Sequence, residues 1–309
     1  MDLSIVVTVY NHKDIVSDLV QAIADQVRER DLRFEIILVD DCSQDGSADV
    51  IEKLAEQLDF VKGIVLFSNA GQHRAMTAGI DAASGDQVLI MDGDFENPVT
   101  AIIPLYEKIT TEDLDIVCAV ANNRQSLSRE ITSALFYFTL KNVFRVDIIR
   151  NQLMMRIMTG EFVRKFRRYN ERVRTIAGLT TTIGGRTGTV ETTLGKRHSG
   201  TSNYNFLSRA DLYLDVILGL TSNPLKALLY AGLATLVATG LASIFYLYRY
   251  FDTGVLPGFT TLILSIFFFG SANMISIALV ARYLAIIYTE VRERPMYLVR
   301  DKYNFPETS

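Results

Sequence analysis

Two carboxylates, Asp92 and Asp94, follow the apolar, strand-like segment 87–91 and are separated only by Gly93. Carboxylate oxygens suit the hard ions Mg²⁺ and Mn²⁺, which keep some waters and take further ligands from substrate phosphates. Gly93 would allow the backbone to approach this point closely. The same pattern also occurs in ordinary turns, so the pattern alone leaves both a metal-diphosphate site and a simple turn open.

The segments that must position these residues alternate between two kinds over the first 120 residues. Apolar, strand-like runs lie at 3–9, 34–39, 63–67, 87–91 and 115–120, and amphipathic stretches lie at about 14–29, 47–58, 72–83 and 99–110. This alternation predicts βαβ units and an α/β, Rossmann-like domain with a mostly parallel sheet. Ligands of such sheets bind beyond the carboxyl ends of the strands.

Polar residues follow three of the predicted strands, and they would meet at one sheet edge. They are Tyr10 and Asn11, Asp40 and Asp41, and Asp92 and Asp94. A carboxylate of the second pair could accept hydrogen bonds from a nucleobase or a ribose. Ser43 or Asp45, shortly after that pair, could instead cap the next helix.

Two further segments could bind phosphate. In the segment 69–79, Gly71 permits a tight turn and Arg74 adds a positive charge. The free amides at the start of the predicted helix would also favour an anion. The alternative is an ordinary loop between a strand and a helix. In 196–204, Arg197 could bind phosphate through paired donors, or the basic residues could be attracted to anionic lipid head groups. Arg124, in a predicted loop, could also reach a phosphate or simply be solvated.

Two long apolar segments, about 227–248 and 259–289, predict a hairpin of transmembrane helices. The first would span roughly 33 Å, which matches a hydrocarbon core of about 30 Å. Basic residues are concentrated on the outer flanks, so both ends and the domain 1–204 are expected on the cytoplasmic side. Residues 205–225 predict an amphipathic helix in the membrane interface, or alternatively a core helix, and 291–309 a cytoplasmic tail.

The charge, the cysteines and the N-terminal segment indicate which partners and which compartment to expect. The chain has 309 residues and a formal charge of -4, which argues against nucleic acid as a partner. Cys42 and Cys118 are the two cysteines, and they are expected to be reduced on the cytosolic side. The N-terminus begins directly with a strand-like run, so we expect no signal peptide there.

Together these motifs resemble glycosyltransferase family 2, which has a GT-A fold, and in particular its polyprenyl-phosphate glycosyltransferases. That group includes the undecaprenyl-phosphate aminoarabinose transferases and the dolichol-phosphate mannose synthases. The resemblance covers nearly the whole chain. It is carried by residues 9–11, 39–43, 69–73 with 78–79, 91–98, 197–204, 223–226 and 287–295.

The resemblance implies a membrane-anchored inverting glycosyltransferase that uses Mg²⁺ or Mn²⁺. It would move a sugar from a nucleotide-sugar donor to polyprenyl phosphate on the cytoplasmic face of a bacterial inner membrane, for a cell-surface glycan or lipid modification. The implied roles are metal binding by Asp92 and Asp94, and catalysis by Asp94. Donor binding would involve Tyr10, Asn11, Asp41, Gly71, Arg74 and Asp92, and acceptor or phosphate binding Arg124, Arg197, Ser202 and Tyr204.

The chain departs from the family pattern at several positions. Thr8 replaces a usual proline, and His12 stands where an acid is usual. Arg150 or Asn151 stands where many relatives have an acid; Asp147, nearby, could substitute as a catalytic residue. An acceptor phosphate is already ionised at pH 7, so a strong base is less necessary than for a hydroxyl acceptor.

Two alternatives stay open at this point. The acceptor could be a lipid-linked saccharide, or the chain could be a non-catalytic membrane scaffold descended from such enzymes. The sugar, the nucleobase and the formation of a homo-oligomer are also left open by the sequence.

Overall fold

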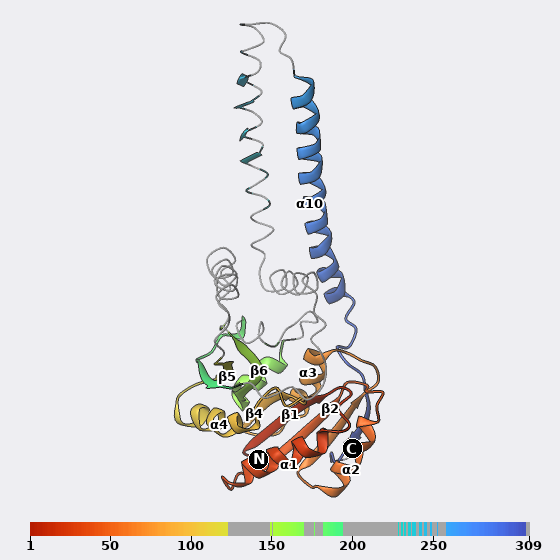
Figure 1. Cartoon of the computed structure of the whole chain (residues 1–309), viewed down its shortest axis with the longest axis vertical. Coiled ribbons are helices and arrows are strands. Elements are labelled where there is room, and N and C mark those ends of the chain that lie inside the picture. Colours follow the sequence, from red (N-terminus) through yellow and green to blue (C-terminus); the bar gives the residue numbers. More distant parts are fainter. Residues whose placement is uncertain are drawn as a thin grey trace.

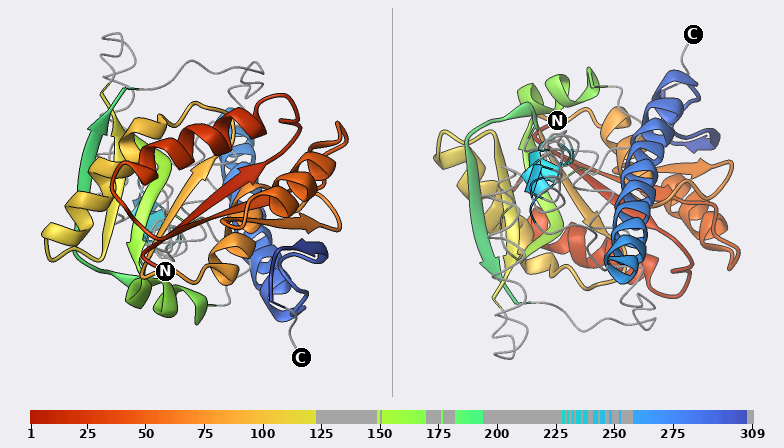
Figure 2. Two further views of the ribbon diagram at one scale, coloured as in Figure 1. Left: turned by 90° about the horizontal axis from the view of Figure 1, so that it is seen from below. Right: turned by 90° about the horizontal axis from the view of Figure 1, so that it is seen from above.

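The computed structural model describes residues 1–122, 149, 151–169, 176, 182–193 and 258–306, together with single positions between 228 and 252. Its centre is an eight-stranded sheet with the order β7-β5-β6-β4-β1-β2-β3-β8 (Figures 1 and 2). The strands are β1 Leu3–Val9, β2 Phe34–Asp40, β3 Val61–Leu66, β4 Gln87–Asp92, β5 Ile116–Ala121, β6 Gln152–Thr159, β7 Thr187–Thr192 and β8 Val299–Tyr303.

The first four strands run parallel, in the spatial order β3-β2-β1-β4. Their sequences are near-continuous apolar runs, as expected for strands that are covered on both faces. The prediction of an α/β domain with a mostly parallel sheet is therefore confirmed. β6 was not predicted as a strand, and it lies antiparallel between β4 and β5.

Helices cover both faces of the sheet (Figure 2). Apolar residues of α1 (Val16–Arg28), α2 (Ser47–Gln57) and α4 (Ile102–Thr111) pack on one face. Those of α3 (Gln72–Ala82) and α6 (Gly160–Arg167) pack on the other. A 3₁₀ turn, η1 (Val99–Ala101), leads into α4. Each amphipathic stretch predicted in the first 120 residues is helical.

The C-terminal segment contains a strand that the sequence did not reveal. β8 pairs antiparallel with β3 at the edge of the sheet, with Gly63 opposite Tyr303 and Leu66 opposite Val299. The Asn304 side chain also donates to the Val61 carbonyl oxygen, at 2.7 Å. The segment after the last helix therefore returns to the domain that begins the chain.

The last helix, α10 (Phe259–Val291), is 33 residues long and rises away from the sheet (Figure 1). Its stretch Phe268–Val291 has a mean hydropathy of 1.6 and none of it is buried, so it is long and apolar enough to cross a membrane. This helix coincides with the second predicted span. The first, 227–248, is described only at separate positions, which are helical, and the predicted helix 128–144 and the interfacial segment 205–225 lie outside the described residues, so a two-helix hairpin is not shown.

Candidate active site

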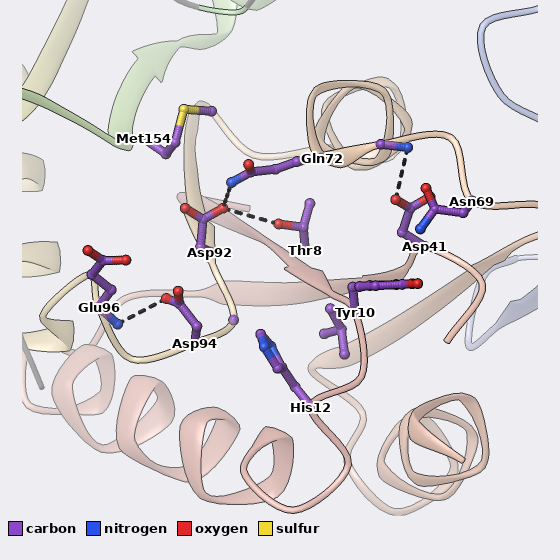
Figure 3. A pocket seen from close by; sticks show the side chains of 13 residues that line it. Thr8, Tyr10, His12, Asp41, Asn69, Gln72, Asp92, Asp94, Glu96 and Met154 are labelled. Atoms are coloured by element: carbon purple, nitrogen blue, oxygen red, sulfur yellow. Dashed lines mark hydrogen bonds between the residues drawn. The ribbon is translucent and has the colours of Figure 1, made fainter. Parts of the chain in front are cut away.

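A cleft of about 460 Å³ opens at the carboxyl ends of β1, β2 and β4 (Figure 3). The sheet order places β2 on one side of β1 and β4 on the other. Chain connections diverge at this point, which is where ligands bind in open α/β sheets. The cleft is lined by Thr8, Val9, Tyr10, His12, Asp41, Asn69, Gly71, Gln72, Asp92, Gly93, Asp94, Glu96 and Met154.

Gly93 lies where the turn after β4 crosses the end of β1. Its amide donates to the Thr8 carbonyl oxygen at 3.0 Å, and a Cβ added here would lie 2.7 Å from that same oxygen. Any larger residue would push the turn away from β1. The glycine therefore holds Asp92 and Asp94 against the end of the neighbouring strand, as the sequence suggested.

Asp92 is the last residue of β4 and receives three side-chain hydrogen bonds. Its Oδ1 accepts from Gln72 Nε2 and from Thr8 Oγ1, and its Oδ2 accepts from Asn97 Nδ2, the last two at 3.4 Å. Burial raises the pKa of this carboxyl to about 6, the bond from Gln72 opposes the rise, and the charge of Asp94 adds to it. The carboxylate is thus held in place by three neutral donors.

Asp94 lies in the tight turn after β4 and is only 7 % exposed. Its Oδ1 accepts from the Glu96 amide at 3.0 Å, which fixes the side chain beside the cleft (Figure 3). The next residue, Phe95, has a φ of 61°, in the left-handed region. Strained backbone of this kind is common at functional sites.

Asp41, beyond the end of β2, organises the loop that enters α3. Its two carboxylate oxygens accept from the amides of Ala70 and Gly71, at 2.6 and 2.9 Å. Gly71 has a φ of +89°, which favours glycine. The carboxylate therefore fixes one wall of the cleft, and burial raises its pKa, while the two amide bonds act in the opposite direction.

The structure brings together five of the residues predicted from the sequence: Tyr10, Asp41, Gly71, Asp92 and Asp94 all line the cleft. Asn11 lies beside it, where its Oδ1 accepts from the Gln44 amide at 2.9 Å.

Arg74 does not line this cleft and faces a second cavity. Five other predicted residues lie outside the described residues, and their roles stay predictions. They are Arg124, Asp147, Arg197, Ser202 and Tyr204.

Several lining residues were not predicted as site residues, among them His12, Gln72, Glu96 and Met154. Gln72 directly follows Gly71 and Glu96 follows Asp94 by two residues, so proximity to the motifs was a signal for both. Met154 comes from β6, which the sequence did not reveal as a strand. His12 was noticed only as a departure from a pattern, although its buried Nδ1 has no hydrogen-bond partner among the described residues.

The donor set fits a divalent cation that also binds a diphosphate. Asp92 and Asp94 offer hard oxygen ligands, and both line the cleft. Nowhere in the described part of the chain do three or more His, Cys, Asp or Glu side chains form a group that could hold a metal. The remaining ligands would therefore be water and substrate phosphate, as is usual for Mg²⁺.

We expect Asp92→Asn to stabilise the metal-free protein at pH 7.5. The pKa of this carboxyl is about 6 in the folded chain against 3.8 for the unperturbed group, so the fold carries a buried charge above pH 6. Protonation removes this cost as the pH falls from 6 towards 4, and the advantage of the variant should vanish there. Thermal unfolding at pH 7.5 and pH 4 measures it, with exposed Glu56→Gln as control. An unfolding temperature at pH 7.5 no higher than that of the unmodified chain would contradict the expectation.

Residues 4–178 match the family described as Glycosyl transferase family 2. The chain is 31 % identical over 305 residues to an undecaprenyl-phosphate 4-deoxy-4-formamido-L-arabinose transferase of Serratia proteamaculans, covering 96 % of this chain and 93 % of the relative. It is 29 % identical to a prophage-derived bactoprenol glucosyl transferase of Shigella flexneri, over 97 % and 98 % of the two chains.

Among solved structures, a mannosyltransferase of Pyrobaculum calidifontis in complex with GDP-Man and Mn²⁺ superposes with a TM-score of 0.52 at 17 % identity. The likeness covers 95 % of this chain and 88 % of that one. At this identity the likeness concerns the fold, and it supports a GT-A-like arrangement of the mixed, mostly parallel sheet.

Proposed function

The chain belongs to glycosyl transferase family 2, and from this premise we propose that it transfers a sugar from a nucleotide donor to polyprenyl phosphate at the cytoplasmic face of a membrane. The donor would lie in the cleft at the ends of β1, β2 and β4. The product would be a lipid-linked sugar for a cell-surface glycan or lipid modification.

The observation that carries this proposal is the length of the similarity. Relatives named for undecaprenyl phosphate and bactoprenol align over nearly the entire chain, including the part that forms α10. A carboxylate-lined cleft and an exposed apolar helix in one chain suit a polar donor and an acceptor held in a membrane.

The chain's own residues would prepare the donor for transfer. Asp41 holds the loop before α3, so the start of that helix faces the cleft with a fixed geometry. Gln72 and Thr8 orient Asp92. The acceptor phosphate oxygen would attack the anomeric carbon, the bond to the departing nucleoside diphosphate would break, and the configuration would invert.

Asp92 and Asp94 would hold the Mg²⁺ or Mn²⁺. A bound divalent cation supplies neutralising charge to the leaving diphosphate. Because the acceptor phosphate is already ionised at pH 7, the attack does not need a strong base. Asp147 stays the proposed candidate for any residual base function.

A donor screen tests this proposal directly. The full chain in detergent is incubated with undecaprenyl phosphate, Mn²⁺ or Mg²⁺, and a panel of nucleotide sugars, and lipid-linked product is measured. Product with undecaprenyl phosphate supports the proposal. Product only with a lipid-linked saccharide would move the acceptor to a hydroxyl group, and the absence of both product and metal-dependent nucleotide binding would favour a scaffold.

We also propose that the chain crosses the bacterial inner membrane twice, through α10 and the segment 227–248, with the catalytic domain cytoplasmic. The apolar, unburied surface of Phe268–Val291 supports a span there. The basic residues that follow it, Arg292 and Arg294, favour a cytoplasmic C-terminal end. Both ends of the chain would then lie on the side where nucleotide sugars are available.

We expect Arg197→Ala to lower turnover by about tenfold or more, because a charge-assisted bond to phosphate contributes roughly 1.5–3 kcal/mol. Arg197→Lys should restore only part of the activity, since lysine lacks the planar pair of donors. Initial rates in detergent, at saturating donor and varied undecaprenyl phosphate, measure both variants. If Arg197→Ala only loosened attachment to anionic membranes and turned over normally in detergent, Arg197 would be a head-group contact instead.

A further inference from the structure

A second cavity lies where α3 meets the end of α10. Its volume is about 340 Å³, and it is lined by Arg74, Tyr288, Thr289, Arg292, Arg294, Pro295 and Met296. We call it the arginine cavity. Figure 1 shows the end of α10 next to α3, above the sheet.

The arginine cavity gathers three positive charges from two elements far apart in sequence. Arg74 belongs to the first turn of α3, whereas Arg292 and Arg294 follow α10. No acidic residue lines the cavity. Among the described residues, none of the three arginines forms an ion pair, and Arg292 instead lies over the ring of Tyr288 at 5.2 Å.

After α10 the chain returns to the sheet, and hydrogen bonds made there hold the two sides of the arginine cavity together. Tyr297 Oη donates to Asp81 Oδ2 of α3 at 2.8 Å, and the Phe67 amide donates to the Leu298 carbonyl oxygen at 2.8 Å. These bonds fix residues 295–298 against α3. The convergence of the arginines is therefore built into the fold rather than produced by a freely moving tail.

The arginine cavity lies at the end of the apolar stretch Phe268–Val291. If α10 spans the membrane, this is the level of the lipid phosphates. Guanidinium groups bind phosphate through paired donors, and several near one point favour an anion. The C-terminal end of α10 carries a partial negative charge that one arginine would offset, and two further arginines remain for a ligand.

We propose that the arginine cavity binds the phosphate group of a membrane lipid, separately from the nucleotide in the cleft. This inference rests on the proposed membrane span of α10, but not on sugar transfer. The lipid could be the polyprenyl phosphate acceptor or an anionic phospholipid, because both present a phosphate at the same depth. Only one residue, His73, separates Arg74 from Gln72, which contacts Asp92, so an acceptor phosphate held here would lie close to the cleft.

Equilibrium binding to the full chain in detergent micelles tests the inference with three probes: radiolabelled undecaprenyl phosphate, phosphatidylglycerol and inorganic phosphate. We expect Arg292→Gln with Arg294→Gln to weaken the binding of at least one lipid by about a hundredfold, roughly tenfold for each arginine. Arg74→Gln, which changes the arginine contributed by α3, should weaken the binding of the same lipid by about tenfold. Inorganic phosphate should bind more weakly than the lipid, because it has no tail.

Arg300→Gln is the matched control, since Arg300 lies in the same C-terminal segment and pairs with Asp301 at 2.8 Å instead of facing the cavity. It should change lipid binding by less than about threefold, as expected for an exposed charge. Loss confined to undecaprenyl phosphate would assign the arginine cavity to the acceptor, and loss of phosphatidylglycerol binding would assign it to an anionic phospholipid. Unchanged lipid binding in the double variant, or an equal loss in Arg300→Gln, would overturn the inference.

Mn²⁺-dependent binding of UDP and GDP is measured on the same preparations. Arg74→Gln should leave it unchanged, because Arg74 does not line the cleft. If Arg74→Gln weakened nucleotide binding but bound lipid normally, Arg74 would be a donor-binding residue and the inference would be overturned. If the unmodified chain bound no nucleotide at all, the proposed function would fail while the lipid result would stand on its own.

Discussion

Asp94→Asn should reduce sugar transfer by at least about a hundredfold, the scale expected when fixed charge is removed from the point where negative charge develops. The substitution keeps the size of the side chain. It also keeps the Oδ1 atom that accepts from the Glu96 amide at 3.0 Å, so the turn after β4 should survive. What is lost is one of the two carboxylate charges that would bind a divalent cation next to the diphosphate.

Two measurements separate this effect from damage to the fold. Mn²⁺-dependent binding of nucleoside diphosphate should fall together with transfer, whereas thermal unfolding without metal should be little changed. Asp45→Asn is the matched control, because Asp45 Oδ1 accepts from the Ser47 amide at 3.0 Å at the start of α2, outside the cleft. Near-normal turnover in Asp94→Asn would show that this carboxylate is not part of a metal site.

Periodicity in the sequence predicted the parallel half of the fold well, because each of those strands is a buried apolar run between amphipathic stretches. β6 was not found for a physical reason. Its sequence includes Arg156, which is buried, donates to the carbonyl oxygens of Leu153 and Met154, and interrupts the apolar run. β8 was not found because Val299–Tyr303 is short, charged and mostly exposed, as edge strands often are.

The candidate site was predictable where its residues directly follow strands. Asp92 and Asp94 sit where the pattern placed them, and the role of Gly93 follows from the distance of 2.7 Å that a Cβ would have to the Thr8 carbonyl oxygen. The function of Asp41 was harder to foresee. Its carboxylate is occupied by two backbone amides, a contact between segments 29 and 30 residues apart that no local pattern reveals.

Arg74 lines a different cavity from its neighbours in the motif, and its role in donor binding stays a prediction. It was expected to add charge to the nucleotide site, because it lies in the same motif as Gly71. Successive residues of a helix point in different directions, so Gln72 lines the cleft while Arg74 faces the arginine cavity. Its partners there, Arg292 and Arg294, are more than two hundred residues away in the chain, and the return of the C-terminal segment to α3 and β3 brings them close.

Truncation after Tyr297, which removes β8, should destabilise the catalytic domain by about 3–5 kcal/mol. The loss combines the β3–β8 ladder with the burial of two aromatic side chains, Tyr303 and Phe305, each contributing roughly 1–2 kcal/mol. A change of this size should lower the unfolding temperature by about 10 °C. The truncation would also expose β3, whose residues are almost all buried, and an uncovered apolar edge strand promotes aggregation.

Thermal unfolding and size-exclusion chromatography of the full chain in detergent measure the effect, and truncation after Pro306 is the control because it keeps β8 and Phe305. We expect this control to behave like the unmodified chain. The truncation after Tyr297 retains α10 and every residue of the arginine cavity, but it removes the Leu298 carbonyl oxygen that anchors them to the sheet. Lipid binding should therefore weaken as well, although no arginine of the cavity has been changed. A truncated chain that unfolds at the same temperature, stays monodisperse and binds lipid normally would show that β8 neither supports the sheet nor positions the end of α10.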